Sequence, residues 1–256
     1  MNPAEFHLID MNTWPRREHY EYYKNLVQTS YNLTAYVDIS KLLFRCNETK
    51  QKFYPTFVYA ITKTVNEIKE LRMAYDSDGQ LGWYDYLNPS YTIFHQDDET
   101  FSDVWSPWDD DFKIFYDNMT QDMGIAKDIK GVKAKPNKPD NFLPVSNSPW
   151  TTFTGYSCDT FHPSPLLFPV ITFGRYFSNK VMPDCLGRSM SLSHISNQGA
   201  VSDYGIRFLV PVNIFVPHMV ADGYHVGKFF SELQEFCDRA PKWIPDPAPK
   251  KKGWFR

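Results

Sequence analysis

The chain has 256 residues, of which 42% are hydrophobic and 17% aromatic, so it can bury a core in one large domain or two small ones, and disorder throughout is excluded. Its formal net charge of −3 offers no general attraction to nucleic acid or to an anionic membrane, and neither is expected as a partner. No apolar stretch approaches the length of about 20 residues that a membrane span needs, and the N-terminus lacks the layout of a signal peptide, so we expect a soluble cytoplasmic protein.

The N-terminal part of the chain predicts two helices and several short strands. Thr13 can cap the first helix, and Pro15 fits only in a first turn. The aromatic and apolar residues that follow at helical intervals are Tyr20, Tyr23, Val27 and Tyr31. Such a stripe is typical of a packed core, although it can also line a site. A second helix begins at Lys52, which taken alone is a solvated surface charge, and its apolar stripe ends at Leu71. Short strands are expected at residues 72–75, 81–87 and 91–95.

The middle of the chain predicts a third helix, from Ser106 to about Met123. The lysine- and proline-rich stretch 126–140 is expected to be an exposed loop rather than a nucleic-acid patch, because few aromatic residues interleave its charges. Residues 144–150 should form a loop that leads into a strand at 151–153. A serine in such a loop is usually a turn former.

The stretch 208–216 predicts a largely buried strand, since it is short, continuously apolar apart from Asn213, and rich in branched and aromatic side chains. Pro211 and Pro217 cannot donate to a hydrogen-bond ladder, so we expect this strand to be irregular or to lie at a sheet edge. After Gly223 the apolar residues recur at three- and four-residue steps, which predicts an amphipathic helix.

His218 lies where this strand gives way to a turn and then to the helix, a position from which a rigid scaffold can present a catalytic group. An imidazole, with an ordinary pKa of about 6.5, can accept a proton from a hydroxyl near neutral pH and return it later. A core histidine whose nitrogens are satisfied by backbone hydrogen bonds fits the same pattern.

Asp222 allows three interpretations. It could orient His218 as the carboxylate of a triad, or it could cap the following helix or form an internal ion pair, and we favour the structural roles. Zinc ligation by the pair lacks a third ligand nearby. The four cysteines are scattered without a CxxC pair or a zinc-binding spacing, so reduced thiols are expected.

The pattern His218-x-x-x-Asp222-Gly223 resembles the active-site signature of the trimeric (type A) chloramphenicol acetyltransferases and, more distantly, that of the dihydrolipoyl acyltransferases. The resemblance covers about residues 6–240. Further segments resemble the family in the same order, at residues 16–23, 52–55, 99–102 and 146–150. The resemblance implies an α+β fold of the CoA-dependent acyltransferase type, a two-layer sandwich in which helices pack on one side of a mixed sheet. It also implies a single domain over residues 1–240.

The reaction that the resemblance implies is acetyl transfer from acetyl-CoA to a hydroxyl of chloramphenicol, which inactivates the antibiotic. His218 would act as general base for direct attack in a ternary complex, and Ser146 rather than Ser148 would stabilise the oxyanion. Arg16 would hold Asp222 in a buried ion pair, a backbone carbonyl could fix the tautomer of His218, and no metal is implied. The family is a homotrimer, in which His218 of one chain would face the aromatic pocket of its neighbour.

The same resemblance implies two groups of binding residues. The acceptor alcohol would be bound by Tyr22, Tyr23, Thr29, Tyr31, Phe101, Tyr156, Cys158 and Thr172. The coenzyme would be bound by Lys52, Tyr54, Arg175 and Tyr176. Thr172, Arg175 and Tyr176 belong to a strand expected over residues 169–176.

The chain departs from the family pattern at several points. The connection between Tyr176 and Arg207 is longer than in the family, so we expect an extended hairpin insertion at about 178–205. Residues 241–256 lie beyond the family's usual end and are expected to form a flexible or surface-draped tail. Thr29 and Cys158 are unusual for the pocket, which leaves two alternatives open. One is the same chemistry on a different acceptor alcohol, and the other is a non-catalytic trimer that binds hydrophobic ligands.

Overall fold

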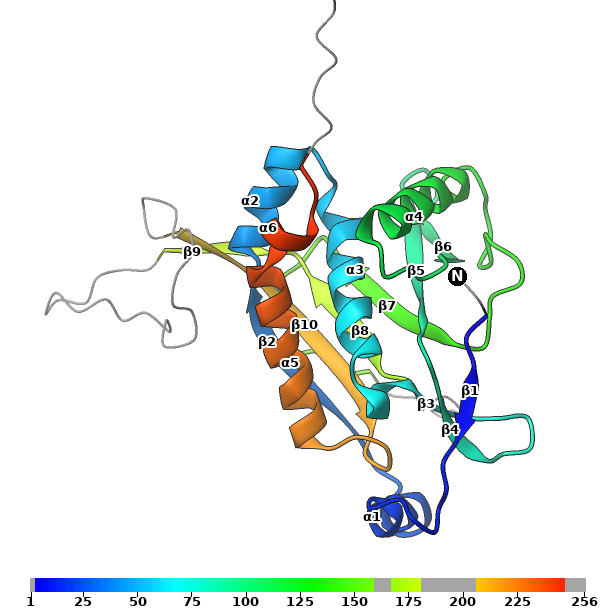
Figure 1. The fold of residues 1–256 in the computed structure, drawn as a ribbon. Coiled ribbons are helices and arrows are strands. Elements are labelled where there is room, and N and C mark those ends of the chain that lie inside the picture. The colour runs from blue at the N-terminus through cyan, green and yellow to red at the C-terminus, as the bar shows by residue number, and fades with distance from the viewer. Residues whose placement is uncertain (1–2, 159–166, 181–205, 247–256) are drawn as a thin grey trace, which may run out of the picture.

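The computed structural model describes residues 3–158, 167–180 and 206–246, which form an α+β fold in two layers (Figure 1). The strands are β1 (Phe6–Leu8), β2 (Ser30–Asp38), β3 (Met73–Tyr75), β4 (Leu81–Tyr84), β5 (Asn88–His95), β6 (Thr100–Trp105), β7 (Phe142–Ser148), β8 (Val170–Gly174), β9 (Phe177–Lys180) and β10 (Ile206–Pro217). The α-helices are α1 (Arg17–Tyr22), α2 (Ser40–Thr49), α3 (Phe53–Asn66), α4 (Phe112–Ala126), α5 (Gly223–Asp238) and α6 (Ala240–Trp243). A π-helical turn covers Tyr23–Val27, and a 3₁₀ turn covers Lys69–Arg72.

A seven-stranded mixed sheet forms one layer, with the order β2-β10-β8-β7-β5-β6 and with β9 paired to the start of β10. β7 runs parallel to both β5 and β8, whereas β10 is antiparallel to its neighbours β2, β8 and β9. The helices α2, α3, α4 and α5 lie together on one face of this sheet (Figure 1). The strands β1, β4 and β3 form a separate three-stranded sheet. The expected two-layer fold with helices on one side of a mixed sheet is confirmed.

The helix α3 forms the centre of the helical layer, where it packs against both α4 and α5. Its apolar stripe is fully buried: Phe57, Ile61 and Val65 are each 0% exposed. Burial of such a side chain contributes about 1.5–3 kcal/mol to stability. The predicted stripe from Lys52 onward is therefore confirmed, although its last part, near Leu71, belongs to the 3₁₀ turn that follows the helix.

The strand β10 lies in the interior of the sheet, which excludes one of the two expected alternatives, the position at a sheet edge. It pairs with β2 along Leu209–Pro217 on one side. On the other side it pairs with β9 at residues 206–209 and with β8 at residues 212–215. Pro211 falls between these two partners and Pro217 is the last residue of the strand, which is how an interior strand can contain both prolines.

The N-terminal helical segment ends earlier than its aromatic spacing predicts. Gln28 has a φ of 48°, in the left-handed region, and the chain leaves the helix there. Tyr31 consequently belongs to β2, where it lies opposite Val216 of β10. The spacing of Tyr31 from Val27 fits a helix by coincidence, because the left-handed residue reverses the chain before Tyr31 is reached.

The helix predicted from Ser106 to about Met123 is α4, and it begins at Phe112. The side chain of Asp111 caps it by accepting from the N–H groups of Lys113 and Ile114. Ser106 is fully buried instead, and its hydroxyl donates to Asp122 of α4 at 2.7 Å. A buried polar side chain needs such a partner, and this requirement, rather than capping, accounts for Ser106.

The loop over residues 127–140 runs along the surface, as expected, but several bonds hold it against the sheet. Lys135 contacts Asp122 of α4 at 2.8 Å, and Lys138 contacts Asp103 of β6 at 2.6 Å. The indole N–H of Trp105 donates to the carbonyl of Pro136. Lys135 and Lys138 therefore help to hold the loop against the rest of the fold.

Two further expectations were wrong near the middle of the chain. Ser146 lies within β7 and not in a loop, and residues 151–153 form no strand. The parallel pairing of β7 with β5 and β8 extends strand structure through a segment whose serines and prolines locally favour turns.

The two departures from the family length lie largely outside the described residues. Of the expected insertion at 178–205, residues 181–205 are not described, and neither are residues 247–256 of the expected tail. The first part of that tail packs against the fold, since α6 includes Trp243, whose ring stacks on Phe236 at 4.7 Å, and Ile244 is 1% exposed. The packed chain therefore extends past the predicted boundary at residue 240.

Candidate active site

His218 immediately follows β10, at the point where this strand pairs with the start of β2. Its backbone N–H donates to the carbonyl of Thr29 at 3.0 Å. The N–H groups of Val220 and Ala221 both contact the carbonyl of Pro217, which closes a tight turn after the strand. The turn ends at Asp222, and α5 starts one residue later. The catalytic candidate is thus held by the end of one buried strand and the start of one helix.

The imidazole of His218 lies against two tyrosines of the same chain. Tyr23 stacks on it with ring centroids 3.9 Å apart and the planes inclined by 13°, and Tyr31 lies at 5.2 Å with its plane tilted by 56°. The Nδ1 atom is buried and has no hydrogen-bond partner among the described residues. Among the described residues, Nδ1 therefore lacks the backbone hydrogen bond that a satisfied core histidine would make. It also lacks a backbone carbonyl that could fix the tautomer of the ring.

Asp222 has the two structural roles that we favoured and makes no hydrogen bond to His218 among the described contacts. Its carboxylate caps α5 by accepting from the N–H of Tyr224 at 3.0 Å. Its other oxygen, Oδ2, accepts from Nη1 of Arg16 at 2.6 Å. Burial by itself acts to raise the pKa of Asp222, but the Arg16 hydrogen bond and the nearby charges of His225 and Arg16 outweigh it and lower the pKa to about 2. Asp222 is therefore ionised, and its bonds to Arg16 and Tyr224 hold the end of the turn.

Tyr31 lies close enough to this ion pair to respond to it. Burial, followed by the negative charge of Asp222, raises the pKa of Tyr31 to about 12, against an opposing effect of Arg16. Its hydroxyl is buried and unpartnered among the described residues, and so is Nε of Arg16. Buried polar groups without a partner are rare in native proteins, and a catalytic role is one of the explanations for them.

A row of polar residues crosses the sheet at the level of Ser146. Ser146 of β7 is the neighbour of Thr172 in β8, which in turn is the neighbour of Asn213 in β10. Thr172 and Asn213 are 3% and 1% exposed. The amide of Asn213 donates to Thr34 Oγ1 and to the carbonyl of Tyr156, each at 3.0 Å, which holds the segment around Tyr156 on the sheet. Sequence reasoning noted Asn213 only as the single polar residue of an apolar strand, and that interruption was the signal for its role.

A single chain does not bring Ser146 and His218 together. Ser146 is level with position 213 of β10, and positions 213 and 218 are separated along the strand by about 16 Å, at roughly 3.3 Å per residue. The proposed acceptor residues divide in the same way. Tyr23, Thr29 and Tyr31 lie near His218, whereas Thr172 is the sheet neighbour of Ser146. The segment of Tyr156 and Cys158 lies over β2 and β10, where it is bonded to Asn32 and Asn213.

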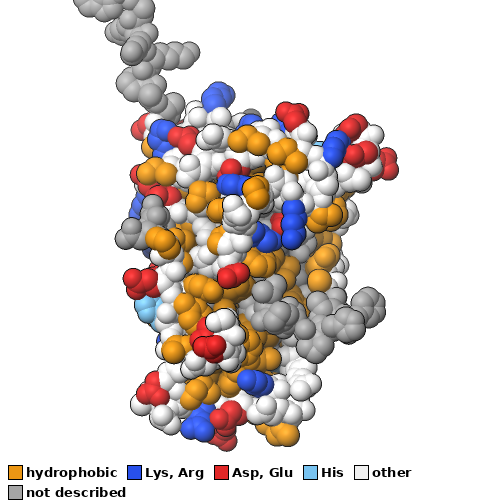
Figure 2. Space-filling view, turned by 90° about the vertical axis from the view of Figure 1, so that its right-hand side faces the viewer, with side chains coloured by type: hydrophobic (Ala, Val, Ile, Leu, Met, Phe, Trp, Pro, Cys, Tyr) orange, Lys and Arg blue, Asp and Glu red, His pale blue; other side chains and the backbone are white. Residues whose placement is uncertain are grey.

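The remaining acceptor candidates are exposed aromatic side chains. Tyr22 is 49% exposed, Phe101 55% and Tyr156 40%. Phe101 lies opposite Phe94 in the β5–β6 pair, and Phe94 makes an edge contact with Trp150. Apolar side chains also form a band through the middle and lower part of the face shown in Figure 2. Such exposed apolar area is characteristic of interaction surfaces.

The coenzyme candidates differ in exposure. Lys52 is exposed just before α3, and Arg175 and Tyr176 are exposed just after β8. The ring of Phe53 lies 5.5 Å from that of Tyr176, which places the start of α3 beside the end of β8. Tyr54 differs from the expectation, because its hydroxyl is buried with no partner among the described residues and its ring packs on Tyr91 and Phe173. A direct bond from this hydroxyl to a solvated nucleotide does not fit that position.

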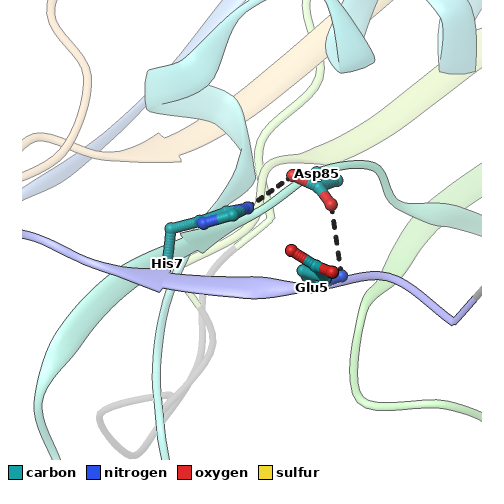
Figure 3. A group of neighbouring side chains, drawn as sticks. All are labelled: Glu5, His7 and Asp85. Atoms are coloured by element: carbon teal, nitrogen blue, oxygen red, sulfur yellow. Dashed lines mark hydrogen bonds and ion pairs between the residues drawn. The ribbon is translucent and has the colours of Figure 1, made fainter.

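A separate cluster of possible metal ligands lies at the other sheet, where Glu5, His7 and Asp85 offer ligand atoms within 4.8 Å of one another (Figure 3). Nε2 of His7 is bonded to Oδ1 of Asp85 at 2.6 Å, and Oδ2 accepts from the N–H of Glu5 at 3.3 Å. These bonds use both oxygens of Asp85. The cluster is explained as the link between β1 and the residue that follows β4.

Comparison with known proteins decides the family. Residues 4–199 match the family model for chloramphenicol acetyltransferase. The chain is 36% identical over 242 residues to a chloramphenicol acetyltransferase of Clostridium perfringens, with 94% of this chain and 98% of the relative covered. It is also 36% identical over 239 residues to one of Staphylococcus aureus, with 93% and 99% covered. The chain belongs to the chloramphenicol acetyltransferase family.

Solved structures agree with membership of the chloramphenicol acetyltransferase family at the level of the fold. A chloramphenicol acetyltransferase superposes with a TM-score of 0.68 at 20% identity, covering 92% of this chain and all of that one. A probable dihydrolipoamide acetyltransferase of Listeria monocytogenes follows with a TM-score of 0.60 at 14% identity, covering 90% and 93%. Within the described ranges, no helix combines the length and the apolar character that crossing a bilayer requires.

Proposed function

We propose that this member of the chloramphenicol acetyltransferase family transfers acetyl from acetyl-CoA to a hydroxyl of chloramphenicol and thereby inactivates the antibiotic. The observation that carries the proposal is the placement of His218. It stands at the end of β10 between aromatic rings, in a turn that Asp222 and Arg16 anchor. The relatives named chloramphenicol acetyltransferase support chloramphenicol as the substrate. The cytoplasmic location remains a prediction.

In the proposed reaction His218 takes the proton of the acceptor hydroxyl as the hydroxyl oxygen attacks the thioester carbonyl. A tetrahedral intermediate forms, and Oγ of Ser146 donates a hydrogen bond to its oxyanion. The C–S bond then breaks, and the protonated His218 returns its proton to the departing thiolate of CoA. Neither an acyl-enzyme nor a metal takes part in this scheme.

The two halves of the site lie far apart in one chain, which supports a site between subunits. In the proposed homotrimer, His218 of one subunit faces Ser146 and Thr172 of its neighbour. Tyr23 and Tyr31 touch His218 of their own chain, so these two residues belong to the half-site that supplies the base. The expectation was that His218 faces the aromatic pocket of its neighbour, whereas these two tyrosines of the expected pocket lie on His218 of their own chain.

The direct test measures thiol release from acetyl-CoA in the presence of chloramphenicol. We expect turnover by the wild type, its loss in His218→Ala, and its retention in His19→Ala, which removes an exposed histidine of α1. Turnover on another hydroxylated acceptor in place of chloramphenicol would support the first alternative. Binding of chloramphenicol without thiol release from any acceptor would support the non-catalytic alternative. Undiminished turnover by His218→Ala would overturn the mechanism.

The subunit arrangement can be tested with hybrids. His218→Ala and Ser146→Ala chains are unfolded, mixed in equal amounts and refolded. If each site uses His218 of one subunit and Ser146 of the next, every mixed trimer regains one intact site, and random assembly restores roughly a quarter of wild-type activity. If both residues act within one subunit, the mixture stays as inactive as its parents. A monomer found by light scattering would also exclude the arrangement.

A further inference from the structure

His225, in the first turn of α5, contacts Asp222 at Oδ1, the carboxylate oxygen that Arg16 does not hold. Its Nδ1 lies 2.9 Å from Oδ1 of Asp222 and 3.2 Å from the backbone nitrogen of the same residue. Its Nε2 lies 3.8 Å from Oε1 of Glu70, in the 3₁₀ turn after α3. The residue is only 8% exposed, although it stands in the first turn of a helix beside Tyr224, which is 76% exposed.

Each protonation form of this ring keeps a bond to Asp222. With a proton on Nδ1, the imidazole donates to Oδ1. With the proton on Nε2, Nδ1 accepts from the N–H of Asp222 and Nε2–H points toward Glu70. With both protons, the ring serves both carboxylates. The charged groups around it are Arg16 on the α1 side, Asp222 on its own helix and Glu70 on the 3₁₀ turn.

The consequence concerns the turn that carries His218. Arg16 holds Oδ2 of Asp222, and His225 holds Oδ1 or the backbone nitrogen. In either form His225 adds a further bond to the last residue of the turn, whose Oδ1 also accepts from the N–H of Tyr224. A base displaced by about 1 Å from its reacting proton can lose about 100-fold in rate, so a second anchor on this turn has a kinetic effect even where it adds little stability.

We propose that His225 is a positioning residue for His218, that it acts through Asp222, and that Glu70 holds its ring. This inference rests on the proposed function, because it assumes that His218 is the base. His225 touches no substrate in this scheme. Its role is to keep the turn from Pro217 to Asp222 in the arrangement that presents the imidazole.

The test compares three variants at position 225 with a matched control. His225→Asn keeps a hydrogen-bonding atom near the place of Nδ1, His225→Gln moves that atom outward, and His225→Leu removes it. The control, Tyr224→Ala, changes the exposed neighbour in the same turn. We expect His225→Leu and His225→Gln to lower kcat about 10-fold with both KM values within about twofold, His225→Asn to recover most of the loss, and the control to match the wild type.

Melting temperatures separate positioning from simple destabilisation. Equal losses of kcat in the Leu and Asn variants, or a full kcat in His225→Leu, would overturn the inference. NMR of the His218 imidazole provides a reading that does not depend on turnover, and its resonances should change in His225→Leu but not in Tyr224→Ala. An unchanged His218 spectrum in His225→Leu would overturn the positioning role. A wild type without thiol release, by contrast, would overturn the proposed function and leave the NMR comparison to decide the contact.

Discussion

Arg16 and Asp222 are 206 residues apart in sequence and joined by a 2.6 Å hydrogen bond between Nη1 and Oδ2. The contact links the segment just before α1 to the first turn of α5, so it joins the N-terminal tyrosines to the turn that carries His218. The two side chains are 18% and 31% exposed. Charge, helix capping and placement of the catalytic candidate therefore depend on a single carboxylate.

Removal of either partner should lower stability by a different amount. Asp222→Ala deletes the helix cap together with the ion pair, and we expect a loss of about 2–3 kcal/mol in the free energy of unfolding. Arg16→Ala deletes only the pair, which is partly exposed and screened, so about 1–2 kcal/mol is expected. Urea denaturation of both single variants and the double variant gives the coupling energy. A native stability of Asp222→Ala would contradict the pairing.

The same pair predicts a dependence of stability on pH. The pKa of Asp222 is lowered from 3.8 to about 2 in the folded chain, so the unfolded chain binds this proton more readily. The stabilisation is therefore complete above the unfolded value and is lost as the pH falls from about 4 to 2. Asp222→Asn keeps the cap and removes the charge. The difference in unfolding free energy between wild type and Asp222→Asn should be constant above about pH 5 and should shrink toward pH 3; a difference independent of pH would count against the depressed pKa.

Ser146 should act on the transition state more than on binding. We expect Ser146→Ala to lower kcat about 100- to 1000-fold, with both KM values within about twofold, because the oxyanion exists only after attack. Ser148→Ala is the matched control, since Ser148 belongs to the same strand and is the other serine of this segment. Initial rates with chloramphenicol and acetyl-CoA distinguish the two. The larger loss in Ser148→Ala would transfer the role to that residue.

The buried hydroxyl of Tyr54 provides a test of the coenzyme residues. Because this group has no partner among the described residues, Tyr54→Phe should leave stability unchanged or raise it by up to about 1 kcal/mol. We expect an unaltered KM for acetyl-CoA. Lys52→Ala should show the reverse behaviour, with a higher KM and unchanged melting, since Lys52 is exposed at the start of α3. A higher KM in Tyr54→Phe would show that the hydroxyl binds the coenzyme after all.

The packing of the chain beyond residue 240 can be measured at Ile244. This side chain is 1% exposed, and the carbonyl of the same residue accepts from Arg45 of α2 at 2.8 Å. Ile244→Ala should cost about 2–4 kcal/mol of unfolding free energy. Ile125→Ala, at a position that is 56% exposed in α4, should cost far less. Similar values for the two variants would show that this segment does not contribute to the core.

Local pattern was sufficient for some elements of the fold. The apolar stripes of α3 and α5 indicated both helices because a helix that packs on a sheet must bury one face, and the period of its apolar residues records this directly. Asp222 before Gly223 indicated the cap of α5 for a similarly local reason. The buried strand at β10 was also indicated by its apolar run, but the edge position considered for it and the loop expected around Ser146 are not found. The effect of a proline or a serine in a strand depends on which neighbour pairs with it, and that neighbour is distant in sequence.

The sequence by itself determined which chemical groups are available. These are an imidazole at the end of an apolar strand, a carboxylate at the start of a helix, and an arginine in a segment that resembles the chloramphenicol acetyltransferases. Only the tertiary structure decided which groups meet. It placed Tyr23 and Tyr31 on His218, connected His225 to Asp222 and Glu70, and left Ser146 about 16 Å along the strand direction from His218. These relations depend on strand register and on packing between remote segments, and no short stretch of residues contains that information.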